Sequence, residues 1–133
     1  MDAPGFSIAG IDHVVVRVRD LARALAFYRD TLGCTVEREQ HAQGLTQLRA
    51  GRSLIDLVTA DGPLGRRAAA EASGMDHFCL SIVPFDAGAL CTHLAAHGVA
   101  AGEPALRYGA EGEGLSIYIE DPDGNRVELK GVP

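Results

Sequence analysis

GMDHFCLSI, residues 74–82, nearly repeats GIDHVVVRV, residues 10–18, from the other half of the chain. Each copy contains a histidine that is followed by a run of residues typical of a β-strand. Each half also ends in an apolar stretch that contains one carboxylate. The matched residues are His13 and Asp56 in the first half, and His77 and Glu128 in the second. The sequence therefore predicts two copies of one small unit, and we expect the four matched residues to meet at a metal ion.

The composition is that of a globular protein. Of the 133 residues 47% are hydrophobic, and the net charge is −6. We expect one domain, residues 1–133, with the first repeat at about 8–60 and the second at about 74–131. The mild acidic balance disfavours nucleic acid or an anionic membrane surface as the main partner. No run approaches about 18 apolar residues, so no membrane-spanning helix is expected.

Neither the N-terminus nor the cysteines indicate secretion. Residues 1–10 contain no basic region followed by a long apolar core. The three cysteines, Cys34, Cys79 and Cys91, fit neither a disulfide framework nor a CxxC metal site, and we expect them to pack as small apolar residues. These features predict a cytoplasmic protein.

The first half is predicted to have the order β-α-β-β-β. Alternation along residues 11–18 places His13, Val15 and Arg17 on one face and three valines on the other, so the valine face should pack on a helix. That helix is expected between Asp20 as N-cap and Gly33 as C-cap. Three more strands are predicted at 35–39, 45–49 and 53–59, followed by a linker at 60–73 with room for a short helix.

The second half is predicted to repeat this order. A strand at 76–83 has the same division of faces, and a helix at 87–97 follows Asp86 as N-cap. Two strands, 115–120 and 126–130, are joined by DPDGN, which is strong turn chemistry. The glycine-rich residues 102–114 are predicted to form a long loop that acts as a lid over a site.

These elements predict an α+β fold of two βαβββ repeats. Because the helices would cover only one side of the sheets, the repeats can form a concave mixed sheet around a metal site. Two imidazoles and one or two carboxylates suit Zn, Ni, Co, Mn or Fe, and such a site leaves positions open for water or substrate. The predicted ligands are His13, Asp56, His77 and Glu128.

Each candidate residue also has a purely structural explanation. A single histidine at a strand end is more often a packing residue than a ligand, and Glu128 could pair with Arg126 or Lys130. Asp56 lies in an apolar stretch and needs a partner, for which Arg49, Arg52 or a metal are the options. His93 and His97 have the i, i+4 spacing of a zinc site, but without the metalloprotease glutamate they favour a solvated helix face.

Four motifs together resemble the vicinal oxygen chelate superfamily, which includes glyoxalase I, fosfomycin-resistance proteins, extradiol dioxygenases and bleomycin-binding proteins. These motifs are IDHVVVRV at 11–18, AFYRDTLG at 26–33, MDH at 75–77 and SIYIEDPDGNRVE at 116–128. The resemblance implies His13, His77 and Glu128 as metal ligands. It places Asp56 where glyoxalase I has a fourth ligand, a glutamate that is one methylene longer.

The resemblance also implies further roles and a partner. Arg17 looks like the arginine that holds the glutathione part of the glyoxalase I substrate, and Tyr118 is a further substrate-binding candidate. Family members commonly form the site across a homodimer or between tandem halves, so a homodimer is expected. The final stretch is most similar to glyoxalase-like proteins of uncharacterised substrate, among them a virulence-associated group.

Several activities are compatible with this resemblance. A glyoxalase-type lyase would isomerise a hemithioacetal of glutathione or another thiol, with Glu128 or Asp56 removing a carbon-bound proton. An extradiol-type dioxygenase would need only two histidines and one carboxylate on Fe²⁺. A fosfomycin-type thiol transferase would need a cationic pocket, to which Arg17 and Arg107 could contribute. A non-catalytic drug- or metabolite-binding protein is the last alternative, although such proteins typically lack the metal ligands.

Overall fold

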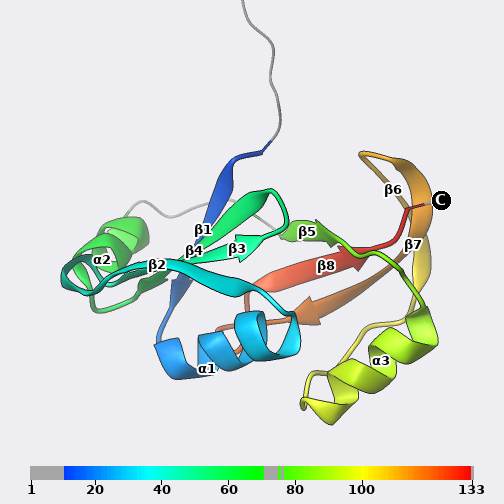
Figure 1. The fold of residues 1–133 in the computed structure, drawn as a ribbon, viewed down its shortest axis with the longest axis horizontal. Coiled ribbons are helices and arrows are strands. Elements are labelled where there is room, and N and C mark those ends of the chain that lie inside the picture. The colour runs from blue at the N-terminus through cyan, green and yellow to red at the C-terminus, as the bar shows by residue number, and fades with distance from the viewer. Residues whose placement is uncertain (1–10, 71–74, 76, 133) are drawn as a thin grey trace, which may run out of the picture.

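Two four-stranded mixed sheets form the framework of the protein (Figure 1). The structure is a computed structural model that describes residues 11–70, 75 and 77–132, without the side chains of 67–70. The first sheet has the strand order β1-β4-β3-β2 and the second has the order β5-β8-β7-β6. In each sheet the first strand pairs in parallel with the last, and the other pairs are antiparallel. The predicted pair of βαβββ modules is therefore confirmed.

The first module contains β1 (His13–Val18), α1 (Leu21–Leu25), the π-helical turn η1 (Ala26–Thr31), β2 (Thr35–Gln40), the 3-10 turn η2 (His41–Gln43), β3 (Leu45–Ala50) and β4 (Ser53–Thr59). The linker holds α2 (Pro63–Ala70), and the second module contains β5 (Phe78–Ser81), α3 (Ala87–Ala96), β6 (Ala105–Gly109), β7 (Gly112–Glu120) and β8 (Arg126–Lys130). No helix in the described residues is long and apolar enough to cross a membrane.

The helix boundaries follow from the capping residues found in the sequence. The Asp20 carboxylate accepts a hydrogen bond from the backbone N–H of Arg23 at 3.1 Å, and Asp86 caps α3 in the same way. Gly33 stands just after the first helical segment with φ of 84°, a conformation that favours glycine. The second part of that segment, η1, is π-helical, which was not predicted.

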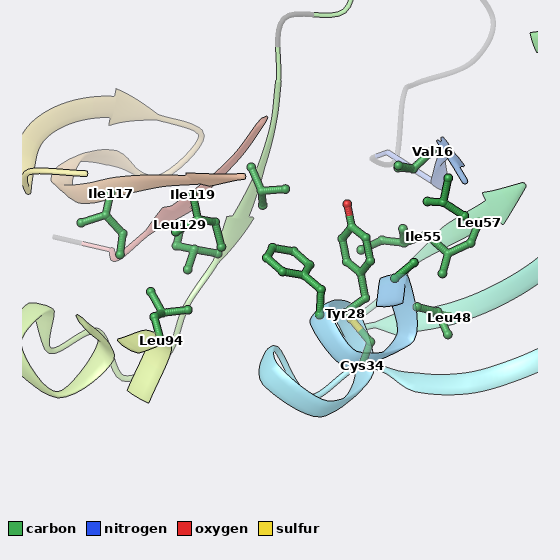
Figure 2. Close-up of a cluster of buried hydrophobic side chains, with 14 residues drawn as sticks. Val16, Tyr28, Cys34, Leu48, Ile55, Leu57, Leu94, Ile117, Ile119 and Leu129 are labelled. Atoms are coloured by element: carbon green, nitrogen blue, oxygen red, sulfur yellow. The ribbon is translucent and has the colours of Figure 1, made fainter. Parts of the chain in front are cut away.

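Both α1 and α3 lie on the same side of the two sheets, below them in Figure 1. Their apolar side chains meet alternate residues of the strands, as the period-two pattern predicted. Figure 2 shows Tyr28 of η1 beside Ile55, and Leu94 of α3 facing Ile117 and Leu129. All five side chains are buried in one apolar cluster that extends through both modules.

The glycine-rich residues 102–114 do not form the predicted loop. They contain β6 and the start of β7, which pair from Ala105 with Ser116 to Gly109 with Gly112. The prediction of a loop here was wrong: the segment folds back on itself as a β-hairpin, which its glycine-rich composition does not favour. The predicted short helix of the linker is present as α2.

Candidate metal-binding site

The predicted ligands lie on the face of the sheets that is turned away from α1 and α3, called here the polar face. On β1 the residues of this face are His13, Val15 and Arg17, and all three are exposed. Asp56 on β4 is the register partner of Val15 on β1, so the Asp56 side chain emerges on the same face as Val15. Glu128 on β8 is flanked by Cys79 on β5 and Tyr118 on β7.

The second module brings its two predicted ligands into contact. His77 Nε2 lies 3.1 Å from Glu128 Oε1. The Glu128 side chain is 9% exposed and that of His77 is 29% exposed, so the imidazole covers the carboxylate while one side stays open to solvent. The Tyr118 ring meets the His77 ring edge-on with 5.2 Å between centroids, which fixes the imidazole plane.

The first module has the equivalent pair at a longer distance. His13 Nε2 lies 4.0 Å from Asp56 Oδ2. The other ring nitrogen, His13 Nδ1, donates to Asp12 Oδ2 at 2.7 Å. The pKa of His13 is raised, first by this hydrogen bond and then by the negative charge of Asp56. Asp12 is a site residue that the sequence reasoning missed, although an aspartate precedes the histidine in both repeats.

The partner of Asp56 is different from the one expected. Its Oδ1 accepts a hydrogen bond from Gln47 Nε2 at 3.1 Å. Arg49, one of the expected counter-ions, instead donates to both carboxylate oxygens of Glu37, at 2.7 and 3.3 Å. The second oxygen of Asp56 is therefore left facing His13.

The four predicted ligands form two pairs in one chain and do not form a single cluster. Among residues 11–70, 75 and 77–132, no three His, Cys, Asp or Glu side chains gather closely enough to hold a metal ion. A hollow of about 730 Å³ does lie at the junction of the modules, but none of the four ligands lines it. Each module therefore brings one histidine and one carboxylate together.

Tyr118 stands between two guanidinium groups on the polar face. The Cζ atoms of Arg126 and Arg107 lie 3.9 and 4.5 Å from the centroid of its ring. Arg107 Nη1 also donates to the Oγ and the carbonyl oxygen of Ser116, both at 2.9 Å. Neither arginine could be placed here from sequence, because they come from different strands that meet only through pairing with β7.

Arg17 lies on the polar face, as predicted, and contacts α2. Its Nε donates to the carbonyl oxygen of Gly65 at 3.1 Å. The Nε–H of the guanidinium is therefore held by the linker helix. The other four N–H groups of the guanidinium do not take part in this contact. It lies in the first module, whereas Arg107 belongs to the second.

Two other sequence interpretations change in the structure. His93, expected on a solvated helix face, is exposed but donates from Nε2 to the carbonyl oxygen of Thr31 at 2.8 Å, joining α3 to η1. Cys79, expected to pack as a small apolar residue, is exposed on the polar face. Partial desolvation and the Glu128 carboxylate raise the pKa of its thiol to about 11, which keeps it protonated at neutral pH.

The two βαβββ modules, with a histidine and a carboxylate at matching positions of each, define a known class of protein. Residues 10–129 match the Glyoxalase/Bleomycin resistance protein/Dioxygenase superfamily, and the chain belongs to this family. Its sequence is 35% identical over 124 residues to glyoxalase domain-containing protein RDO1 of Mycosarcoma maydis, covering 92% of this chain and 68% of that protein. It is 31% identical over 121 residues to virulence protein STM3117 of Salmonella typhimurium, covering 90% of this chain and 81% of that protein.

Solved structures agree with this assignment. The crystal structure of virulence protein STM3117 matches with a TM-score of 0.80 at 29% identity, covering 96% of this chain and all of that one. The structure of a lactoylglutathione lyase from Agrobacterium tumefaciens matches with a TM-score of 0.70 at 26% identity, covering 94% and 95% of the two chains. The superfamily resemblance predicted from the motifs is confirmed.

Proposed function

We propose that this chain is a divalent-metal-dependent lyase of the glyoxalase I type, acting on a small substrate with vicinal oxygens such as a hemithioacetal. The observation that carries the proposal is the contact of His77 with Glu128, repeated by His13 and Asp56 at matching positions of the other module. A member of the superfamily that only binds its ligand would have no need for both pairs.

The spacing within the pairs fits two ligands of one ion. Ligand atoms that each lie roughly 2.1 Å from an ion, at angles of roughly 90–109°, are about 3.0–3.4 Å apart. The 3.1 Å between His77 Nε2 and Glu128 Oε1 falls in this range. The 4.0 Å between His13 Nε2 and Asp56 Oδ2 is longer, and a small rotation of the shorter aspartate side chain would close it.

We further propose that two copies of the chain complete the site, His13 and Asp56 of one copy joining His77 and Glu128 of the other. Two features support this arrangement. In the part of the chain that the structure describes, β1 carries His13 and β5 follows His77, and each is an edge strand with a neighbouring strand on one side only. Large apolar side chains near these strands are also exposed, and they include Ile11, Val15, Met75 and Val83.

The residues of the polar face have separate roles in this proposal. When bound, the metal would hold the two substrate oxygens and stabilise negative charge on them. Glu128 is the base that takes the proton from the substrate carbon and returns it to the neighbouring carbon, with Asp56 as the equivalent group of the other module. Tyr118 and Arg17 contact the remainder of the substrate, and a thiol-derived portion such as glutathione would carry carboxylates for Arg17.

One observation favours a second candidate, an extradiol-type dioxygenase. Asp56 is hydrogen-bonded to Gln47, which competes with a role as ligand. His13, His77 and Glu128 alone would make the two-histidine, one-carboxylate set that suits Fe²⁺.

Metal content combined with a substrate screen tests these proposals. The purified protein is supplemented with each candidate metal, dialysed and measured by mass spectrometry, with His77→Ala as control. We expect about one divalent ion per chain in the wild type and turnover of hemithioacetals. Oxygen uptake with catechols would select the dioxygenase, and turnover of fosfomycin with a thiol would select the transferase. A protein that binds no metal under any of these conditions is a binding module, and the lyase proposal is then wrong.

A further inference from the structure

A small cavity opens on the polar face beside Glu128, toward the end of β8 that carries Lys130. Its volume is about 210 Å³. It is bounded by β5, by the end of β8 and by the tip of the β6–β7 hairpin, the segment that was predicted to be a loop. The side chains that line it and carry polar groups are Cys79, Ser81, Tyr108, Glu111, Glu128 and Lys130.

Lys130 is the cation of this cavity, and it is buried. Only 7% of the residue is exposed. Its Nζ donates to the carbonyl oxygens of Gly112 at 2.8 Å and Gly131 at 3.1 Å. Gly109 packs against the Lys130 side chain so closely that a Cβ at Gly109 would stand 3.0 Å from Cδ and Cε of the lysine. This packing restricts the position of the ammonium group. An ammonium group has three donors, so one N–H is left for a further acceptor.

The charge of Lys130 is not balanced by an ion pair. Two acids, Glu111 and Glu128, line the cavity, but among the described residues no carboxylate lies within 4.0 Å of the ammonium. Glu128 stands two residues before Lys130 on the same strand face and is directed at His77. A buried cation without a paired anion is unfavourable, and an anionic ligand would remove that cost.

We propose that Lys130 binds a carboxylate group of the substrate, next to the oxygens that are held at Glu128 and His77. This inference rests on the proposed function, which places the substrate oxygens beside Glu128 and His77. The cavity is smaller than the roughly 300–1,000 Å³ of a complete ligand site, so it accommodates one end of a molecule. The substrate class is therefore a small hydroxy or oxo acid, or an adduct of one.

A carboxylate fits this cavity better than a phosphate. One ammonium with one free N–H makes a single charge-assisted hydrogen bond to a monoanion. A dianionic phosphate would face the carboxylates of Glu111 and Glu128 with only that one cation to balance it. Inorganic phosphate is accordingly the competing ligand in the test.

The test is a titration of metal-free protein, followed by the amide NMR signals of Gly112 and Gly131. The probes are glycolate, its neutral analogue glycolamide, and inorganic phosphate. We expect glycolate to bind at least about tenfold more tightly than glycolamide, and Lys130→Met to lose at least about tenfold in glycolate affinity. Arg38→Met, which removes an exposed cation from β2 of the other module, should bind glycolate like the wild type.

Three results would overturn the proposal. They are equal affinity for glycolate and glycolamide, tighter binding of phosphate than of glycolate, and unchanged glycolate affinity in Lys130→Met. The comparison of glycolate with glycolamide needs no variant, so a Lys130→Met protein that fails to fold does not leave the question open. Because no metal is present, failure here rejects the carboxylate subsite alone, whereas failure of the metal-content experiment rejects the lyase and leaves this titration valid.

Discussion

The phenol of Tyr28 donates a hydrogen bond of 2.8 Å to the carboxylate of Asp121, which joins η1 of the first module to the turn between β7 and β8 of the second. The same carboxylate accepts the backbone N–H groups of Asp123 and Asn125 at 2.9 and 2.8 Å, and the side-chain amide of Asn125 at 2.8 Å. Asn125 in turn donates to the carbonyl oxygen of Arg17 at 3.3 Å. One buried aspartate therefore organises the turn and the junction of the modules together.

Tyr28→Phe should destabilise the protein by about 1.5–3 kcal/mol, because it removes a hydrogen bond to a buried carboxylate. Burial and the charge of Asp121 raise the pKa of Tyr28 far above its ordinary value, so the folded protein keeps the phenol protonated. The unfolded chain ionises near pH 10, and the stability that depends on Tyr28 is therefore lost as the pH rises above about 10. Chemical denaturation at pH 7 and at pH 10.5 measures both effects. A variant with wild-type stability at pH 7 would contradict the role of this contact.

Asp12→Asn should lower the pKa of His13 toward the ordinary value of about 6.5. In the wild type this pKa is raised chiefly by the hydrogen bond to Asp12. Because an imidazole must be neutral to bind a metal, binding should weaken as the pH falls through the pKa of His13, and in the variant this weakening should set in at lower pH. NMR titration of the His13 ring gives the pKa, and metal titrations across pH give the linked affinity. An unchanged His13 titration would show that Asp12 is not the cause of the shift.

Mixing two inactive variants should restore activity if the site is shared between two copies. His13→Ala and Glu128→Gln should each abolish turnover while keeping the fold. In a mixed dimer one site combines both changes and the other has neither, so random mixing should recover about one quarter of wild-type activity. The variants are unfolded together, refolded and assayed, with each variant refolded alone as control. If the complete site lies within one chain, the mixture stays inactive.

Gly65→Ala should destabilise the protein by about 1–3 kcal/mol through overpacking. A Cβ at Gly65 would overlap the backbone carbonyl of Thr59, so α2 would have to move away from β4 and lose its contact with Arg17. Gly88→Ala in α3 is the matched control, because its Cβ would meet only the Asp86 carboxylate at 3.6 Å. This control should gain up to about 1 kcal/mol from helix propensity. Thermal unfolding of both variants measures the difference, and equal midpoints would contradict the close packing of α2.

The sequence by itself determined the order of the elements, except for β6 and the start of β7, and the face on which each candidate ligand lies. Alternation along β1 separated His13 and Arg17 from the buried valines, and Asp20 and Asp86 marked the helix starts, because strand periodicity and capping depend on neighbouring residues. The two similar stretches that contain His13 and His77 predicted the pair of modules, because similar local sequences favour the same local structure.

Only the tertiary structure decided which side chains meet. Asp56 takes Gln47 and not Arg49, and Lys130 lies in a cavity closed by a hairpin that local composition did not predict. These contacts depend on strand register and on which strands pair. The spacing of residues along the chain does not predict either of them. For the same reason the sequence indicated the face on which the four candidate ligands lie, but not that the folded chain assembles them as two separate pairs.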